Sequence, residues 1–163
     1  MAADDIREQI VKYLTDLHST EENAAAQLRT GAEAVNDEQL AQVLREHLRE
    51  TEDHERLVRA RLEALDASPS KLKDVAQKGV AAVGGALTGA APDTTGKVAI
   101  QAFATEHLEI ASYRSLRAVA HQAGDSETVA MAEQILKQEQ AAAHKLDALL
   151  EQAALVGAPQ LAA

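Results

Sequence analysis

The sequence predicts an all-α protein built as a bundle of four long helices, and three observations support this. Of the 163 residues, 35 are alanine and 19 are leucine, which are both strong helix formers. The aromatic residues that favour strands are scarce, with two tyrosines, one phenylalanine and no tryptophan. Apolar residues also recur with the period of a helix along four stretches of the chain. An all-β or doubly wound α/β fold is therefore not expected.

The first half of the chain contains two of the four stretches. The first helix is expected over about residues 4–30, ending near Gly31, because glycine commonly follows the last turn of a helix. The second helix is expected over about residues 38–66, with Asn36 or Asp37 as its N-terminal cap. Both have one apolar face, which is interrupted near the middle by polar side chains.

The second half repeats this organisation. A third helix is expected over about residues 96–122, ending at Gly124, and its apolar residues occupy more than one side. A fourth helix, capped by Asp125 or Ser126, is expected to continue to about residue 153. We expect the third helix to be covered by neighbours on more than one side.

The connections between the helices predict their arrangement. Short links at residues 31–37 and 122–126 join antiparallel neighbours. Residues 66–95 form one long crossover, which could carry an extra short helix within residues 71–90 and is expected to make the first and third helices parallel. One long crossover is the connectivity of ferritin-like bundles.

The predicted domain is therefore a ferritin-like four-helix bundle over residues 1–156, followed by a frayed tail over residues 157–163. The N-terminal segment has neither a basic n-region nor an apolar h-region, so we expect a cytoplasmic protein. The net charge of −10 argues against nucleic acids and anionic membranes as partners. The absence of cysteine excludes disulfides, thiolate metal sites and thiol catalysis.

One carboxylate lies near the middle of each predicted helix, in or beside its apolar face. These residues are Glu21, Glu50, Glu109 and Glu139. At about 1.5 Å per residue, all four lie roughly 15–22 Å from the hairpin loops and are expected to meet at one level of the bundle. An unpaired buried carboxylate costs several kcal/mol or more, so four converging carboxylates require protons or cations.

Two further side chains extend this group. His54 follows Glu50 by four residues, and Glu106 lies one turn before Glu109. Carboxylates with one or two imidazoles suit iron or manganese better than copper or soft metals. We therefore predict a di-iron or manganese site, and the predicted ligands are Glu21, Glu50, His54, Glu106, Glu109 and Glu139.

Three more side chains lie near these carboxylates in the sequence. His47, on the same face as Glu50, fits a satisfied core histidine, or one that hydrogen-bonds to a ligand, better than a ligand. His18 lies one turn before Glu21 and fits an exposed position better than one beside a ligand. Tyr113 fits a plain core residue better than a hydroxyl donor to a ligand carboxylate, which is the alternative.

Four segments resemble motifs of the YciE/YciF family, a bacterial group of stress-associated ferritin-like proteins. The most specific is Glu-His-Leu-Glu-Ile-Ala-Ser-Tyr at residues 106–113, and the others lie at residues 13–21, 47–51 and 136–146. The resemblance spans about residues 10–152. It implies a ferritin-like bundle, often a homodimer, with di-metal ligands at Glu21, Glu50, Glu106, Glu109 and Glu139.

The sequence departs from the family pattern at two positions. Ala143 stands where family members often carry aspartate, and His54 where others carry glutamine. An asymmetric, a mononuclear and an empty site therefore remain alternatives. The preferred function is iron or manganese binding with oxygen or peroxide chemistry during stress, and the alternative is a metal-free helical dimer that acts as a binding scaffold.

Overall fold

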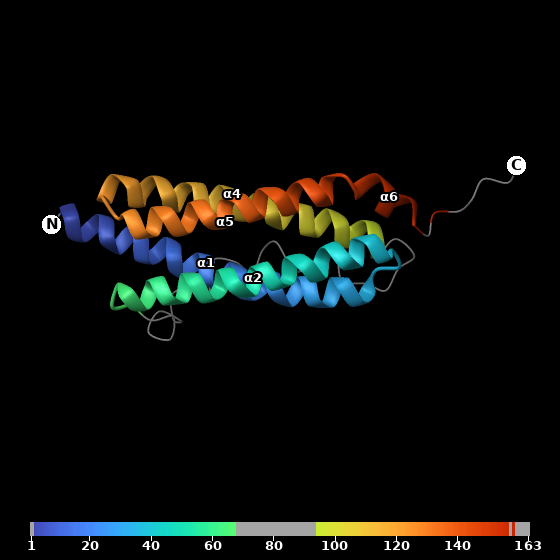
Figure 1. Cartoon of the computed structure of the whole chain (residues 1–163), viewed down its shortest axis with the longest axis horizontal. Coiled ribbons are helices and arrows are strands. Elements are labelled where there is room, and N and C mark those ends of the chain that lie inside the picture. Colours follow the sequence, from blue (N-terminus) through green and yellow to red (C-terminus); the bar gives the residue numbers. More distant parts are fainter. Residues whose placement is uncertain (1, 68–93, 157, 159–163) are drawn as a thin grey trace, which may run out of the picture.

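The computed structural model describes residues 2–67, 94–156 and 158, which fold into an elongated helical bundle (Figure 1). Its helices are α1 (Ala2–Ala34), α2 (Glu38–Ala64), α4 (Thr94–Ala123), α5 (Ser126–Asp147) and α6 (Leu150–Leu155). No helix in these ranges is long and apolar enough to cross a membrane. The all-α prediction is confirmed. The predicted crossover helix and, apart from residue 158, the predicted frayed tail lie outside the described residues.

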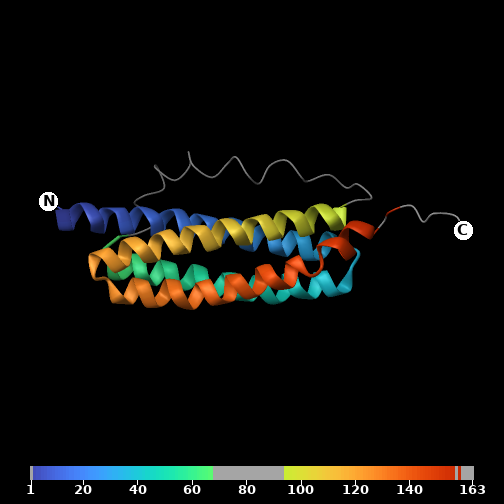
Figure 2. The same cartoon turned by 90° about the horizontal axis from the view of Figure 1, so that it is seen from above.

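The first and third predicted helices, α1 and α4, are antiparallel, so the prediction that they are parallel was wrong. The backbone N–H of Asn36 donates to Thr95 Oγ1 at 3.0 Å, and Gln101 Nε2 donates to Gln27 Oε1 at 2.8 Å. A later residue of α1 therefore contacts an earlier residue of α4, as in an antiparallel pair of helices. The end of α2 and the start of α4 lie at opposite ends of the bundle (Figure 2), and for this reason α2 and α4 run in the same direction.

The helix caps agree with the sequence. Asp37 is the N-cap of α2, and its Oδ1 accepts a hydrogen bond from the Leu40 N–H at 2.8 Å. Asp125 caps α5 in the same way, because its Oδ1 accepts from the Thr128 N–H at 3.0 Å. Gly124 has a φ of 72°, a left-handed conformation that suits glycine after the last turn of α4. The ends of both hairpins are therefore fixed by local side-chain chemistry.

The sequence predicted that the first helix ends near Gly31. In the structure α1 continues through Gly31 to Ala34. A Cβ atom at this position would lie 2.9 Å from Cγ1 of Val98 on α4. The glycine allows α1 and α4 to approach each other closely. A glycine that serves packing between helices has the same sequence signature as one that ends a helix.

The fourth predicted helix is divided in two. Helix α5 ends at Asp147, and α6 begins at Leu150 after a short turn. Helix α6 packs on the start of α4, where a Cβ at Gly96 would lie 3.2 Å from the Ala154 Cα. The break therefore places α6 against α4 at a second point of close contact.

Two apolar clusters fill the bundle on either side of its middle. One cluster includes Leu14 of α1 and Leu62 of α2, and the other includes Leu28 and Leu40 of the same two helices. The middle third of each long helix contributes buried polar side chains instead. The site described below lies in this layer, enclosed by apolar packing at both ends.

Candidate metal centre

The polar layer brings together six side chains that can bind metals, from four helices. Each is at most 2 % exposed; they are Glu21 of α1, His47 and His54 of α2, Glu106 and Glu109 of α4, and Glu139 of α5. Helical spacing explains their convergence, because residues three, four or seven apart lie on the same face of a helix.

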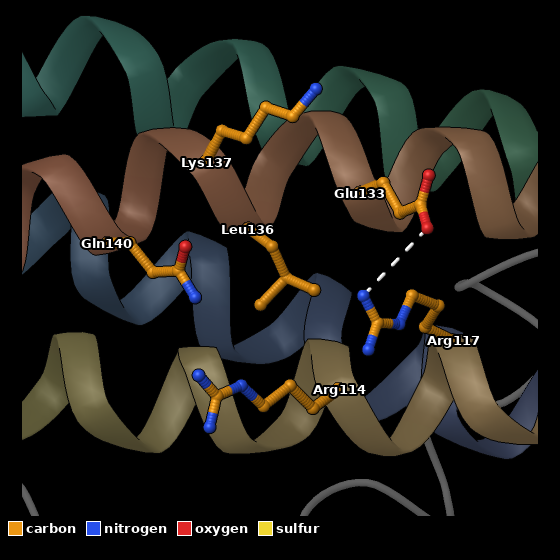
Figure 3. A pocket seen from close by; sticks show the side chains of 6 residues that line it. All are labelled: Arg114, Arg117, Glu133, Leu136, Lys137 and Gln140. Atoms are coloured by element: carbon orange, nitrogen blue, oxygen red, sulfur yellow. Dashed lines mark ion pairs between the residues drawn. The ribbon is translucent and has the colours of Figure 1, made fainter.

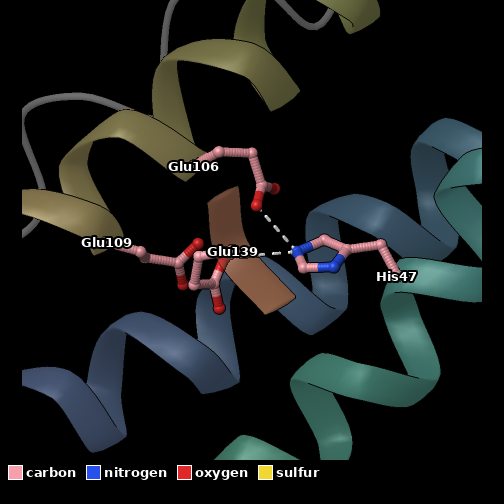
Figure 4. Close-up of side chains that lie close together, drawn as sticks. All are labelled: His47, Glu106, Glu109 and Glu139. Carbon is pink, nitrogen blue, oxygen red and sulfur yellow. Dashed lines mark ion pairs between the residues drawn. The ribbon is translucent and has the colours of Figure 1, made fainter. Parts of the chain in front are cut away.

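These six residues form two groups in which one potential ligand atom per residue lies within 4.8 Å of all the others. The first group is His47, Glu106, Glu109 and Glu139 (Figure 4), and the second is Glu21, His54 and Glu139. Glu139 belongs to both. The two groups therefore describe two adjacent candidate cation positions with one carboxylate in common.

His47 connects the first group to the edge of the bundle. Its Nε2 lies 2.9 Å from Glu106 Oε2 and 3.5 Å from Glu139 Oε2 (Figure 4). Its Nδ1 lies 3.0 Å from Oε2 of Glu50, whose side chain is 34 % exposed. Glu50, a predicted ligand, thus contacts a histidine of the cluster and is a member of neither group.

His54 and Tyr113 shape the second group. His54 Nδ1 lies 2.8 Å from Glu139 Oε1 and 3.7 Å from Glu21 Oε2, and His54 Nε2 lies 3.1 Å from Gln138 Oε1. The Tyr113 hydroxyl donates a hydrogen bond to Glu21 Oε1. Of the two roles that the sequence left open for Tyr113, the structure shows the hydroxyl donor. Glu21 therefore has one oxygen held by tyrosine and the other directed at the second group.

Burial and mutual repulsion favour the protonated forms of the carboxylates. Burial raises the pKa of Glu109 well above its usual 4.5, and the charges of Glu21, Glu139 and Glu106 add to this effect. Burial also raises the pKa of Glu139, to about 7, although the adjacent His54 opposes the rise. These carboxylates are therefore difficult to ionise together unless a positive charge joins them.

The histidines experience the opposite balance. Burial lowers the pKa of His47, but the carboxylates of Glu106 and Glu50 outweigh burial and raise it to about 10. Burial likewise opposes protonation of His54, but Glu139 and Glu21 raise its pKa to about 9. Without a metal ion, protons on the imidazoles supply part of the positive charge that the cluster requires.

The clearest sign that this cluster suits cations is Glu109. Both of its carboxylate oxygens are buried, and neither has a hydrogen-bond partner among the described residues. Buried polar groups in proteins are nearly always hydrogen-bonded, and buried charges are paired or coordinate metals. Oxygen and imidazole donors are also the ligands that iron and manganese accept. The side chains present therefore fit a cation centre.

Two histidines differ from what the sequence favoured. His47 lies in the first group, and its position seven residues before His54 on the same helical face was the signal for this. His18, expected to be exposed, is 6 % exposed, because its Nε2 pairs with Glu55 Oε1 at 2.8 Å across α1 and α2. A side-chain contact between two helices leaves no mark in the periodicity of either helix.

A hollow of about 460 Å³ lies between α4 and α5 (Figure 3). Its lining contains none of the six clustered side chains; the residues are Arg114, Arg117, Glu133, Leu136, Lys137 and Gln140. Leu136, which is 4 % exposed, also belongs to an apolar cluster of the core. The hollow therefore lies outside the polar layer.

A helical bundle with one long connection and a central layer of carboxylates and histidines defines a ferritin-like protein. The chain belongs to the family described as Domain of unknown function (DUF892), which matches residues 5–158. The resemblance to the YciE/YciF family is confirmed by this match and by structural similarity to the stress protein YciF of E. coli.

Solved structures support the fold over nearly the whole chain. A protein from Xanthomonas campestris is 29 % identical, with a TM-score of 0.75 and coverage of 94 % of this chain and 95 % of that one. The E. coli stress protein YciF is 22 % identical, with a TM-score of 0.70 and coverage of 91 % and 96 %. A ferritin-like, diiron-carboxylate protein from Bacillus anthracis is 15 % identical, with a TM-score of 0.72 and coverage of 89 % and 97 %.

Proposed function

We propose that this protein binds two divalent cations, iron or manganese, in the polar layer at the middle of its bundle. The observation that carries the proposal is Glu109, a fully buried carboxylate whose two oxygens lack hydrogen-bond partners among the described residues. Such a group is costly to bury, whether charged or neutral. Cations among Glu109 and its neighbours would remove this cost and the repulsion between the carboxylates.

The two groups supply the ligands. One cation would be held by His47, Glu106, Glu109 and Glu139, and the other by Glu21, His54 and Glu139. We assign Glu50 a different role from the one the sequence predicted. Its carboxylate contacts His47 Nδ1, and this contact fixes the imidazole ring and directs Nε2 into the cluster.

Bound iron would supply electrons to dioxygen or peroxide, which is the chemistry of oxidative stress defence. The chain's own part in this chemistry is to bind the ions and to exclude water. Apolar clusters close both ends of the polar layer, so reactive species formed there would be shielded from solvent. The E. coli relative YciF is a stress protein, which supports a role in the stress response for this chain. We propose a cytoplasmic location for it.

A metal-free helical dimer that serves as a scaffold is the alternative function. It is favoured by Ala142 and Ala143, which provide no ligand one turn after Glu139, and by the pairing of His47 and His54 with carboxylates. A homodimer is also compatible with the exposed apolar side chains of α4. In this alternative the protonated imidazoles would neutralise the layer by themselves.

Metal analysis distinguishes the two functions. The full-length protein is incubated without oxygen with Fe(II) or Mn(II), desalted, and analysed for bound metal. We expect about two equivalents per chain, fewer than one in Glu139→Gln because the shared carboxylate is lost, and about one in Glu21→Gln. The matched control is Glu133→Gln, an exposed glutamate on the same helix as Glu139, which should bind as the unmodified protein does. A protein that binds neither metal, and that is stabilised when Glu21 and Glu139 are replaced by leucine, would favour the scaffold function.

A further inference from the structure

Thr51 differs from the other hydroxyl side chains within the described helices. It lies on α2, four residues after His47 and three before His54, and it is fully buried. Elsewhere in the helix interiors the serine and threonine hydroxyls bond back to the carbonyl four residues earlier, at 2.7–3.2 Å; these are Thr15, Ser19, Thr20, Thr30, Thr105, Ser112 and Ser115. Thr51 makes no such bond.

The Thr51 hydroxyl is without a hydrogen-bond partner of any kind among the described residues, and its Oγ1 is shielded from solvent. Threonine in a helix has two accessible rotamers, and one of them allows the back-bond to the carbonyl. The absence of this bond shows that the hydroxyl is free to meet another acceptor. Valine has the same shape and would avoid a buried, unsatisfied hydroxyl at this position.

The position of Thr51 indicates what such an acceptor is. Residues three or four apart share a helix face, so Thr51 lies between His47, a member of the first group, and His54, a member of the second. The other buried, unpartnered side-chain atoms of the described residues all belong to candidate ligands. Thr51 is thus a hydrogen-bond donor beside the candidate ligands, and it is not itself a member of either group.

From these observations we infer that Thr51 donates a hydrogen bond to a small exogenous ligand that enters the space between the two cation positions. The ligand class is a small molecule or anion with an accepting lone pair, such as water, hydroxide, peroxide or azide. Thr51 is a positioning residue that selects and orients this ligand, and it does not hold the cations. This inference rests on the proposed function, because the ligand occupies a metal-loaded centre.

Azide serves as the probe, and two variants isolate the hydroxyl. Thr51→Val keeps the shape and removes the donor, whereas Thr51→Ser keeps the donor. The Fe(III)-loaded proteins are titrated with azide, and binding is followed by the charge-transfer absorption. We expect unchanged metal content, azide affinity weakened about tenfold in Thr51→Val, as for the loss of one hydrogen bond to an anion, and affinity restored to within about twofold in Thr51→Ser.

A second measurement tests whether the hydroxyl has a merely structural role. In excess chelator, Thr51→Val should unfold at the same or a higher urea concentration than the unmodified protein, because no hydrogen bond is lost. The matched control is Thr15→Val, at a buried threonine of α1 that bonds to the Val11 carbonyl at 2.7 Å, and its azide affinity should not change.

Two results would overturn the role of Thr51 alone. One is a Thr51→Val protein that carries two equivalents of iron and binds azide as tightly as the unmodified protein does. The other is a metal-free Thr51→Val protein that unfolds at a lower urea concentration than the unmodified protein. Failure of the unmodified protein to bind either iron or manganese would instead overturn the proposed function, and the inference with it. The metal analysis and the azide titration therefore separate the two failures.

Discussion

Replacement of Glu109 by methionine is expected to stabilise the metal-free protein. Methionine has a similar length, is unbranched and fills irregular space in a core. The substitution removes a carboxyl group that is fully buried and has no hydrogen-bond partner among the described residues. Burial and the neighbouring carboxylates raise the pKa of Glu109, so the substitution also removes the cost of holding a proton on this group at neutral pH.

The size of the effect follows from two costs. A buried polar group without hydrogen bonds costs about 1–3 kcal/mol. Because burial raises the pKa of Glu109 above 4.5, the folded state retains a proton that the unfolded state releases, and each pH unit of this difference costs about 1.4 kcal/mol. At pH 7.5 we expect a gain of about 1–3 kcal/mol from the first cost, or an increase in Tm of roughly 2–12 °C, and the retained proton adds to this gain. The gain should shrink toward pH 5, where the unfolded carboxyl is partly protonated.

Thermal and urea unfolding in chelator at pH 5 and pH 7.5 measure this gain. The control is Glu133→Met, an exposed position on α5, which should change stability by less than about 0.5 kcal/mol. If Glu109→Met were less stable than the unmodified protein at pH 7.5, the Glu109 carboxylate would have stabilising partners in the metal-free fold. The lack of hydrogen bonds at Glu109 would then no longer indicate a cation centre.

Three further perturbations test other parts of the account. In chelator, Tm should fall between pH 5 and pH 9. The pKa of Glu139 is raised to about 7 and that of His54 to about 9, so across this range the folded state holds protons that the unfolded state has released; a rising Tm would contradict the reasoning. Tyr113→Phe should weaken the binding of one of the two cations in a calorimetric titration, because the Glu21 carboxylate loses the hydrogen bond that orients it. Binding of both ions as tight as in the unmodified protein would show that the hydroxyl is dispensable. Gly31→Ala should lower the free energy of unfolding in urea by about 1 kcal/mol, because its methyl group contacts Val98. In a Val98→Ala background the same substitution should no longer lower it.

Much of the site could be predicted from the sequence because helical periodicity places side chains on faces. Glu21 and Glu139 were evident as single carboxylates on apolar faces, and both are 0 % exposed. The approximate depth of each carboxylate from its hairpin loop also predicted a common level. This level does not depend on the direction of α4, because the carboxylates lie near the middle of the bundle. The wrong prediction for that direction therefore left the predicted cluster intact.

The remaining features depend on contacts between helices, which periodicity does not contain. Glu50 and His47 lie three residues apart on the same helix, and only the packing of α4 and α5 determines that His47 faces the cluster while Glu50 lies at its edge. Gly31 looked like a helix end because its packing partner, Val98, is distant in sequence. The missing hydrogen bond of Thr51 is a property of one rotamer and has no sequence signature.

The anomalous diffraction of crystals grown with Mn(II) would test the metal centre most directly. Two peaks are expected inside the bundle, one beside the His47 and Glu109 side chains, the other beside Glu21 and His54, with Glu139 in contact with both. An interior without anomalous density, or manganese bound only to carboxylates on the outer surface, would contradict the assignment of this layer as a two-cation site.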